Sequence, residues 1–410
     1  MDFFLKDTTK NQLITWNELI SDLSGQNTYN PYCKSEDYYQ VFRHIITSML
    51  IGKEVILLDS DFTDDELIRL TGYSAFDSFN EPLDEDLLKV KDKGELLERL
   101  NKTGNNWKIS IFTSGTTGLP KKVTHSFDSI TRFVKVSERY RMNIWGFAYN
   151  PTHMAGIQVF FQALLNGNAM VRLFNLPPKE ILGAIKENEI TNISATPTFY
   201  RLLLPCDESF KSIERITSGG EKFNENTIAQ LKAIFPNAKI TNVYASTEAG
   251  TIFASENDIF TIKPGYEHLI RIEGDELFLH KSLIGSTDIS IGEWYNTGDV
   301  VEVLAQNPIK FRFISRKSDM INVGGYKVNP LEVEETILTF PGIVNARVYA
   351  KRNSVLGNII CCEVVCNTSE IDEPSIRAFL QSRLQEFKIP RIIRFVNELS
   401  VTRTGKTKRS

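Results

Sequence analysis

Cysteine, histidine and net charge are all scarce in this 410-residue chain. Its five cysteines are too few for a disulfide framework at this length, and its five histidines form no H-x-x-x-H pair. A formal net charge of −4 gives no general attraction for nucleic acid or anionic membrane, so a polyphosphate ligand would need a local site. There is no basic leader with a long apolar core, and no run reaches the roughly 18 apolar residues of a membrane span. We therefore expect a cytoplasmic protein that has no membrane span and does not bind nucleic acid.

Three of the cysteines, Cys361, Cys362 and Cys366, lie close together in the run N-I-I-C-C-E-V-V-C. The β-branched, apolar character of this run predicts a buried strand. A metal site would need further ligands, and no second cluster of cysteine or histidine supplies them. Core packing is therefore favoured over metal binding.

Hydrophobic periodicity predicts an α/β protein with a large N-terminal part of helix-flanked sheets. The length exceeds a usual single-domain core, so two or more domains are expected. Strand and helix patterns alternate, which favours parallel sheets. The expected strands are 54–59, 107–112, 143–149, 168–174, 191–196, 213–217 and 239–244. The expected helices are 36–51, 64–71, 84–100, 126–141, 155–166, 178–188, 197–204 and 224–235.

The pattern changes from about residue 259 to short strands broken by glycine and aspartate. This change fits an antiparallel sheet or a small barrel. A third region follows residues 315–319 and predicts a small α+β domain. Its expected elements are a helix at 330–339, strands at 343–350 and 358–366, and a helix near 373–387.

The stretch Thr113–Lys122, T-S-G-T-T-G-L-P-K-K, directly follows an expected strand. Its glycines let backbone N–H groups approach phosphate oxygens, its hydroxyls add neutral donors, and Lys121 supplies a mobile charge. This composition favours a nucleotide triphosphate site, with an ordinary polar turn as the alternative. Ser126 or Asp128 would cap the helix expected after this loop, and the helix N-terminus would point toward the loop.

Four further stretches carry polar residues. N-V-Y-A-S-T-E-A-G at 242–250 lies at the end of an expected strand, where ligands of open α/β sheets bind. The others are W-Y-N-T-G-D at 294–299, I-S-R-K-S-D-M-I-N-V-G-G-Y-K-V-N-P at 314–330 and T-R-T-G-K-T-K-R at 402–409. Each alone has an ordinary explanation: a strand end, a turn, a polar interdomain loop or a basic tail.

In order and spacing, these five stretches resemble the motifs of one superfamily, which contains AMP-forming acyl-CoA synthetases, adenylation domains of peptide synthetases and beetle luciferases. The similarity runs from about residue 107 to the C-terminus. It implies an AMP-forming acid–thiol ligase (a carboxylate–CoA ligase) that uses ATP, Mg2+ and coenzyme A. It also implies a large ATP- and acid-binding domain at 1–314, a hinge at 315–319, and a small mobile domain at 320–410 that carries the catalytic lysine.

The resemblance further implies a nucleotide site assembled from several stretches. The departing phosphates would be held by Thr113, Ser114, Gly115, Thr116, Thr117, Gly118 and Lys121. The adenine and ribose would be contacted by Gly219, Gly220, Glu221, Tyr244, Asp299 and Arg316. Thr247 would contact the α-phosphate, Glu248 would hold Mg2+, and Lys406 would bridge the acid's carboxylate and the α-phosphate.

For the second half-reaction, the resemblance implies transfer to a thiol, either that of coenzyme A or the phosphopantetheine arm of an acyl carrier protein. The hinge would fall at Ser318 or Asp319. His153 matches a position where the acid meets the thiol tunnel. The Gly-rich loop on the thiol side contains Gly324, Gly325, Tyr326 and Lys327.

The residues around His153 bear on the choice of acid. The aspartate that amino-acid-activating members of the superfamily place here to hold the α-amino group is absent, and Asn150 is the nearest polar residue. The resemblance therefore disfavours an α-amino acid. An aryl or fatty acid is expected instead, although the apolar residues of this segment could equally belong to the core. These residues are Met154, Ile157, Phe160 and Phe161.

The segment before the phosphate loop is shorter than is usual in the superfamily. The first subdomain, at about 1–105, is therefore expected to be abbreviated, which leaves the size of the acid and the choice of thiol open. A non-catalytic nucleotide-binding relative is the alternative from a different class. The presence of both Glu248 and Lys406 argues against it.

Overall fold

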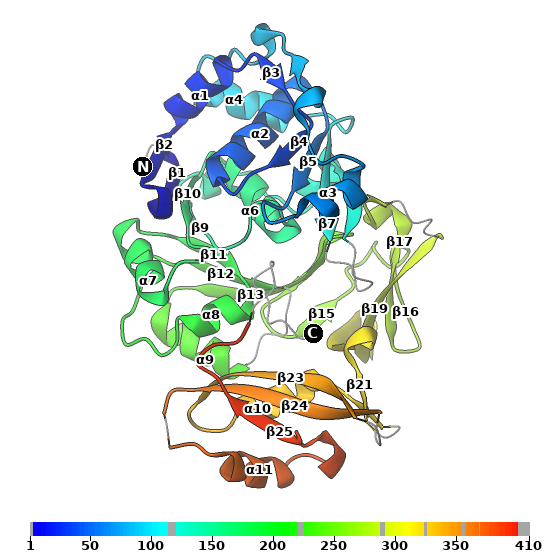
Figure 1. Cartoon of the computed structure of the whole chain (residues 1–410). Coiled ribbons are helices and arrows are strands. Elements are labelled where there is room, and N and C mark those ends of the chain that lie inside the picture. Colours follow the sequence, from blue (N-terminus) through cyan, green and yellow to red (C-terminus); the bar gives the residue numbers. More distant parts are fainter. Residues whose placement is uncertain are drawn as a thin grey trace.

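A computed structural model of the chain describes residues 3–113, 120–219, 225–287, 292–323, 326–353, 357–368 and 370–400. A large N-terminal part of sheets and helices lies above a small C-terminal part (Figure 1). The predicted fold class is thus confirmed. No helix within these ranges is long and apolar enough to cross a membrane.

The largest sheet has eight strands in the order β14-β13-β12-β11-β9-β10-β1-β2. The strands from β13 to β1 pair in parallel, whereas β14 and β2 are antiparallel edge strands. The predictions for β9 to β13 are confirmed, while β1 and β2 were not predicted. The bounds are β1 Phe3–Asp7, β2 Gln12–Thr15, β9 Ile144–Phe147, β10 Ala169–Arg172, β11 Asn192–Ala195, β12 Arg215–Gly219, β13 Lys239–Ser246 and β14 Gly250–Ser255.

Different helices pack on the two faces of this sheet. Ile193, Ile216 and Ile240 of three adjacent strands share one apolar cluster with α7, α8 and α9. Helix α6 belongs to another cluster, in which Phe160 stacks on Phe42 of α2 (Tyr38–Ile51) with ring centroids 4.4 Å apart. The bounds are α6 Met154–Leu164, α7 Pro178–Glu187, α8 Pro197–Leu202 and α9 Glu225–Ile234.

A second sheet has five strands in the order β18-β8-β7-β5-β4. Its strands are β4 Tyr32–Lys34, β5 Val55–Leu58, β7 Lys108–Thr113, β8 Lys121–Ser126 and β18 Ser286–Thr287. The helices of this N-terminal region are α1 Trp16–Ser24, α2 Tyr38–Ile51, α3 Asp64–Thr71, α4 Lys93–Asn101 and α5 Phe127–Thr131. A short pair, β3 Thr28–Tyr29 and β6 Glu81–Pro82, completes it.

The helix predicted over 126–141 is wrong in length and position relative to the phosphate loop. Ser126 does cap α5, since its side chain accepts from the backbone N–H of Ser129, but α5 ends at Thr131. The residues before it form strand β8. Val123 and His125 of this strand are buried and their neighbours are not, which is the alternation of a strand with one face on the core. The N-terminus of α5 therefore follows the end of β8 opposite to the end at which Thr113 pairs with Lys121. The helix predicted at 84–100 is also divided, since only α4 forms an α-helix there.

A five-stranded antiparallel sheet forms the third layer and confirms the change of pattern after residue 259. Its order is β15-β20-β19-β17-β16. The bounds are β15 Ile259–Thr261, β16 Ile270–Glu273, β17 Glu276–His280, β19 Trp294–Gln306 and β20 Ile309–Arg316. Phe253 of β14 packs into its apolar core with Phe260 and Phe311, which joins this layer to the edge of the eight-stranded sheet.

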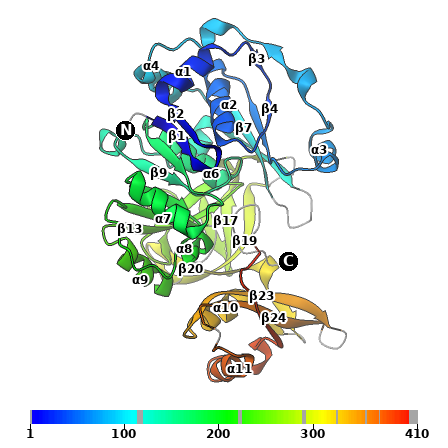
Figure 2. The ribbon, with the colours of Figure 1, turned by 60° about the vertical axis from the view of Figure 1, so that its left-hand side comes forward.

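The C-terminal part has an apolar core of its own and lies at one end of the molecule (Figure 2). Strand β24 contains all three clustered cysteines, and Cys361 and Cys362 are buried in it. The prediction of a buried strand there is therefore confirmed. The elements are β21 Ile321–Val323, β22 Tyr326–Val328, α10 Pro330–Leu338, β23 Ile343–Asn353, β24 Gly357–Cys366, α11 Glu373–Gln381 and β25 Ile392–Phe395.

Candidate functional site

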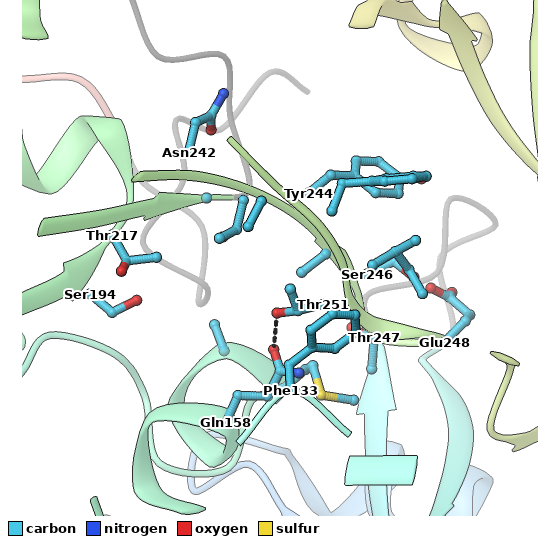
Figure 3. A pocket seen from close by; sticks show the side chains of 18 of the residues that line it. Phe133, Gln158, Ser194, Thr217, Asn242, Tyr244, Ser246, Thr247, Glu248 and Thr251 are labelled. Carbon is cyan, nitrogen blue, oxygen red and sulfur yellow. Dashed lines mark hydrogen bonds between the residues drawn. The ribbon is translucent and has the colours of Figure 1, made fainter. Parts of the chain in front are cut away.

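A cavity of about 1580 Å³ extends between the eight-stranded sheet, α6 and the paired strands β19 and β20. Figure 3 shows the part of it around β13. The structure brings five predicted site residues from three separate stretches to its lining. These residues are Tyr244, Thr247, Glu248, Asp299 and Arg316.

Asp299 links the residues on the β20 side of the cavity. The hydroxyl of Tyr244 donates to Asp299 Oδ2 at 2.5 Å, and Arg316 Nε donates to Asp299 Oδ1 at 3.2 Å. The register of β19 and β20 places Asp299 directly opposite Arg316. The ring of Tyr244 stacks on Phe313 with centroids 4.2 Å apart. Since the two carboxylate oxygens have about four lone-pair sites, Asp299 can accept further donors.

The electrostatics of this side keep the tyrosines neutral. Burial of the phenol, followed by the charge of Asp299, raises the pKa of Tyr244 well above its ordinary range, so its hydroxyl remains a donor. Burial, followed by the charge of Glu248, raises the pKa of Tyr295 to about 12. Burial lowers the pKa of Arg316, but the nearby acidic groups, Asp299 first among them and then Tyr244, Glu248 and Asp319, together outweigh this effect and raise it. The site therefore presents a neutral aromatic wall beside one cation and two carboxylates.

The turn that carries Thr247 and Glu248 is held from two sides. His125 Nε2 donates to the carbonyl of Thr247 at 2.8 Å, and the N–H of Gly285 donates to the carbonyl of Glu248 at 2.7 Å. Burial lowers the pKa of His125, so the ring is neutral and its Nδ1 accepts from Ser129 Oγ at 2.9 Å. A side chain at Gly285 would come within 2.8 Å of the His125 ring, so this close approach requires glycine. No sequence signal indicated His125.

The carboxylate of Glu248 lines the cavity without a hydrogen bond or ion pair to any residue that the structure describes. Hard cations such as Mg2+ prefer oxygen ligands and are commonly held by one or two carboxylates together with substrate phosphates. Across the described ranges, no group of three or more histidine, cysteine or acidic side chains gathers to form a metal site. Glu248 therefore fits a cation whose other ligands come from a substrate.

An acidic residue that the sequence reasoning missed lies on the α6 side of the cavity. His153 Nε2 is 2.9 Å from Asp59 Oδ2, and the two side chains are only 11% and 9% exposed. A carboxylate accepts, so in the neutral ring Nε2 carries the proton and Nδ1 has the lone pair. That Nδ1 has no hydrogen-bond partner among the described residues. Asp59 directly follows the parallel strand β5, and the rule that ligands bind at such carboxyl ends could have identified it.

The apolar candidates near His153 divide between cavity and core. Met154 lines the cavity. Ile157, Phe160 and Phe161 are fully buried in the cluster around α2 and α6, so their alternative assignment to the core is confirmed.

Three predicted residues lie at strand ends beside the cavity. Thr113 and Lys121 pair at the connected end of the β7–β8 hairpin, where β7 ends and β8 begins, and both line the cavity. Gly219 ends β12, where a side chain would come within 2.6 Å of Val243 Cγ2. A glycine is therefore needed for the close approach of β12 and β13 at this point.

The predicted hinge residues also line the cavity. Ser318 and Asp319 belong to the short 3-10 helix Lys317–Asp319, which directly follows β20. Lys327 is exposed on β22 and is not brought to the cavity. The remaining predicted site residues lie outside the described residues, namely Ser114, Gly115, Thr116, Thr117, Gly118, Gly220, Glu221, Gly324, Gly325 and Lys406.

Two family profiles match the chain: AMP-binding enzyme over residues 28–268, and AMP-binding enzyme C-terminal domain over residues 332–406. The 4-hydroxybutyrate–CoA ligase 1 of Metallosphaera sedula is 28% identical over 374 residues, which cover 78% of this chain and 64% of that protein. The mitochondrial acyl-coenzyme A synthetase ACSM4 of Mus musculus is 26% identical over 357 residues, which cover 75% of this chain and 61% of that protein. The chain thus spans less than two thirds of the length of these relatives.

Solved structures share the fold. ATP-bound MatB from Rhodopseudomonas palustris matches with a TM-score of 0.73 at 17% identity, covering 99% of this chain and 94% of that one. The o-succinylbenzoate CoA synthetase MenE from Bacillus subtilis, in complex with its acyl-adenylate intermediate, matches with a TM-score of 0.69 at 18% identity and the same coverage. At this identity the likeness concerns the fold alone.

Proposed function

Because the chain belongs to the AMP-binding enzyme family, we propose that it joins a carboxylic acid to a thiol by means of ATP. The acid and ATP would first form an acyl adenylate and pyrophosphate. The thiol of coenzyme A would then take the acyl group and release AMP. The observation that carries this proposal is the convergence of Tyr244, Glu248, Asp299 and Arg316 in one cavity.

The nucleoside would bind between β13 and β20. One face of the Tyr244 ring is covered by Phe313, and the other is suited to stack on adenine, which would run along Gly219 and the two residues after it. The ribose hydroxyls would donate to the remaining lone pairs of Asp299. Arg316 would keep that carboxylate ionised and oriented, and would be the second partner of the ribose.

The phosphates would lie between the β7–β8 hairpin and the turn after β13. The loop from Thr113 to Lys121 would hold the two phosphates that leave, since both of its ends face the cavity. Thr247 would contact the α-phosphate. Glu248 would hold Mg2+, which neutralises charge on the phosphates when it is bound.

The first half-reaction brings two anions together, because the acid's carboxylate attacks the α-phosphorus. A bond forms from the carboxylate oxygen to phosphorus as the bond to pyrophosphate breaks. Positive charge and fixed donors are therefore the main requirement, and one such donor is typically worth roughly 3 to 4 kcal/mol. Lys406 would supply the positive charge between the carboxylate and the α-phosphate. No nucleophilic side chain is needed.

The second half-reaction would use the His153–Asp59 pair. His153 Nδ1 is buried as the ring stands; once the ring exposes it to the thiol, this nitrogen would take the thiol proton. The thiolate would then attack the acyl carbonyl so that AMP leaves. Asp59 would act as a positioning residue by fixing the ring and its tautomer. The domain from residue 320 would turn about Ser318 or Asp319 between the two steps, bringing the Gly-rich loop that ends at Lys327 to the thiol side.

Acid-dependent exchange of labelled pyrophosphate into ATP, with Mg2+ and a panel of carboxylic acids, tests the first step. Glu248→Gln should reduce exchange at least tenfold, whereas Glu293→Gln, an exposed glutamate outside the cavity, should not. Nucleotide binding without exchange for any acid would favour a non-catalytic relative. AMP release with coenzyme A compared with a holo acyl carrier protein identifies the thiol, because the two share the same phosphopantetheine chemistry.

A further inference from the structure

Near the cavity, one face of the eight-stranded sheet is apolar and the other, which faces the cavity, is polar. Ile193, Ile216 and Ile240 of β11, β12 and β13 point away from it into the core. Side chains alternate along a strand, so the residues that follow each isoleucine face the cavity. Those residues are Ser194, Thr217 and Thr241.

These three residues form a row of hydroxyls across adjacent strands. The parallel register pairs Ser194 with Thr217 and Thr217 with Thr241, and neighbouring strands lie about 4.8 Å apart. Figure 3 shows Ser194 and Thr217 next to each other on the face toward α6. None of the three side-chain oxygens has a hydrogen-bond partner within the described part of the chain.

Helix α6 adds a fourth polar group opposite the sheet. Gln158 Oε1 accepts from Thr251 Oγ1 at 3.1 Å, as drawn in Figure 3. This bond fixes the amide and leaves Nε2 as a donor that no described residue accepts from. A side chain at Gly250 would come within 2.9 Å of that Nε2, so glycine keeps the space beside the amide open.

These groups do not suit a plain hydrocarbon tail. Covering an unpaired hydroxyl or amide with alkyl groups costs about 1 to 3 kcal/mol for each group. Met154 and Val159 of α6 line the cavity, but the fully buried Ile157, Phe160 and Phe161, which would favour such a tail, face the core instead. On β12, the cation nearest to Thr217 is Arg215. Its guanidinium carbon lies 5.0 Å from the centroid of the Tyr140 ring, so Arg215 is already engaged in a cation–π contact. The unpaired groups are therefore neutral donors and acceptors.

We propose that the acid activated by this chain carries one or more hydroxyl groups, which bond to Ser194, Thr217, Thr241 and Gln158. The proposal rests on the proposed function, because it concerns the acid of the same reaction. A site built to bond a hydroxyl discriminates strongly against the analogue that lacks it, since its own polar groups are then left unpaired. The hydroxyls would thus determine specificity, while the carboxylate would remain at the turn after β13.

The test compares matched acids in the pyrophosphate exchange assay. The panel pairs ω-hydroxy acids of four, six, eight and ten carbons, and the hydroxybenzoates, with the unsubstituted acid of the same skeleton. Dicarboxylic acids of the same lengths are included. We expect at least one hydroxy acid to exceed its unsubstituted partner about tenfold or more in kcat/KM. Equal or better use of the unsubstituted acids or of the dicarboxylic acids throughout would overturn the proposal.

Two serine variants give a matched control. Ser194→Ala removes a hydroxyl that faces the cavity, whereas Ser218→Ala removes a buried, unpaired hydroxyl that faces the opposite side of the neighbouring strand. Ser194→Ala and Thr217→Val should lower the hydroxy-to-unsubstituted ratio about tenfold or more, and Ser218→Ala should leave it unchanged. An equal change in all three variants would also overturn the proposal. Exchange with unsubstituted acids alone refutes only this inference, whereas no exchange with any acid refutes the proposed function itself.

Discussion

Asp299 offers the sharpest test of the nucleotide site, because the ribose assignment predicts a change in discrimination as well as a loss of activity. The variants are Asp299→Ala and Asp299→Asn, with Asp275→Ala as the control. Asp275 is an exposed turn aspartate between β16 and β17 and does not line the cavity. The substrates are ATP and 2′-deoxy-ATP, compared in the same exchange assay.

The magnitude follows from the bonds that Asp299 can make. A hydrogen bond to a charged group is worth about 1.5 to 3 kcal/mol, which corresponds to roughly 10- to 150-fold in kcat/KM. The native protein should therefore prefer ATP over 2′-deoxy-ATP by that factor. In Asp299→Ala the two nucleotides should become nearly equivalent, and activity with ATP should fall by at least the same factor. Asp299→Asn should lie between them, because the amide keeps one acceptor oxygen.

A loss of stability alone would lower activity with both nucleotides and would not change the discrimination between them. The Arg316 side chain is 44% exposed, so loss of its ion pair should cost about 1 kcal/mol or less of the free energy of unfolding, as surface pairs do. In Asp299→Ala the buried Tyr244 hydroxyl also loses its acceptor, which should cost about 1 to 3 kcal/mol more. Urea titration of each variant checks this expectation. A folded Asp299→Ala that still prefers ATP over 2′-deoxy-ATP by the native factor would refute the ribose assignment. Loss of discrimination in Asp275→Ala would refute it equally.

Three further predictions concern the catalytic lysine, the thiol step and stability. Lys406→Ala should abolish adenylate formation yet leave thioester formation from a supplied acyl adenylate largely intact; equal loss of both, measured separately, would count against domain alternation. Asp59→Asn should do the reverse and slow the thiol step about tenfold or more at neutral pH, with a shift in its pH profile, because His153 loses its orienting carboxylate; an unaltered profile would contradict this role. Burial lowers the pKa of His44 to about 4, below the roughly 6.5 of an unfolded histidine. The contribution of neutral His44 to the free energy of unfolding is therefore complete above pH 6.5. It falls by about 1.4 kcal/mol for each pH unit as the pH decreases from 6.5 toward 4. His44→Phe, which keeps the ring that stacks on Tyr29 with centroids 5.1 Å apart, should flatten that slope in urea titrations, and an unchanged slope would contradict it.

The sequence predicted most of the regular elements because their periodicities are strong. Strands β9 to β13 have apolar runs of the right length, and helices α6 to α9 between them have apolar residues at helical spacing. Strand β8 was not predicted, because K-K-V-T-H-S contains only one aliphatic residue and its other buried position is His125. That histidine becomes a good core residue only where it can bond to Ser129 and to the turn after β13.

The candidate site could be named from motif spacing but not assembled from it. Tyr244, Glu248, Asp299 and Arg316 follow from the resemblance to a superfamily. The sequence did not indicate that Asp59 meets His153, because they are far apart in the chain and belong to different layers. It also left open whether the apolar residues of α6 face a ligand or the core.

The sequence by itself determined the fold class and the family, because helix and strand periods and motif order are local properties that survive without any partner. Only the tertiary structure decided what the cavity offers to an acid. Whether a hydroxyl on β11, β12 or β13 is covered, bonded or open depends on strand register and on the helix packed opposite. Here the register aligns Ser194, Thr217 and Thr241, and α6 turns Gln158 toward them and its phenylalanines away.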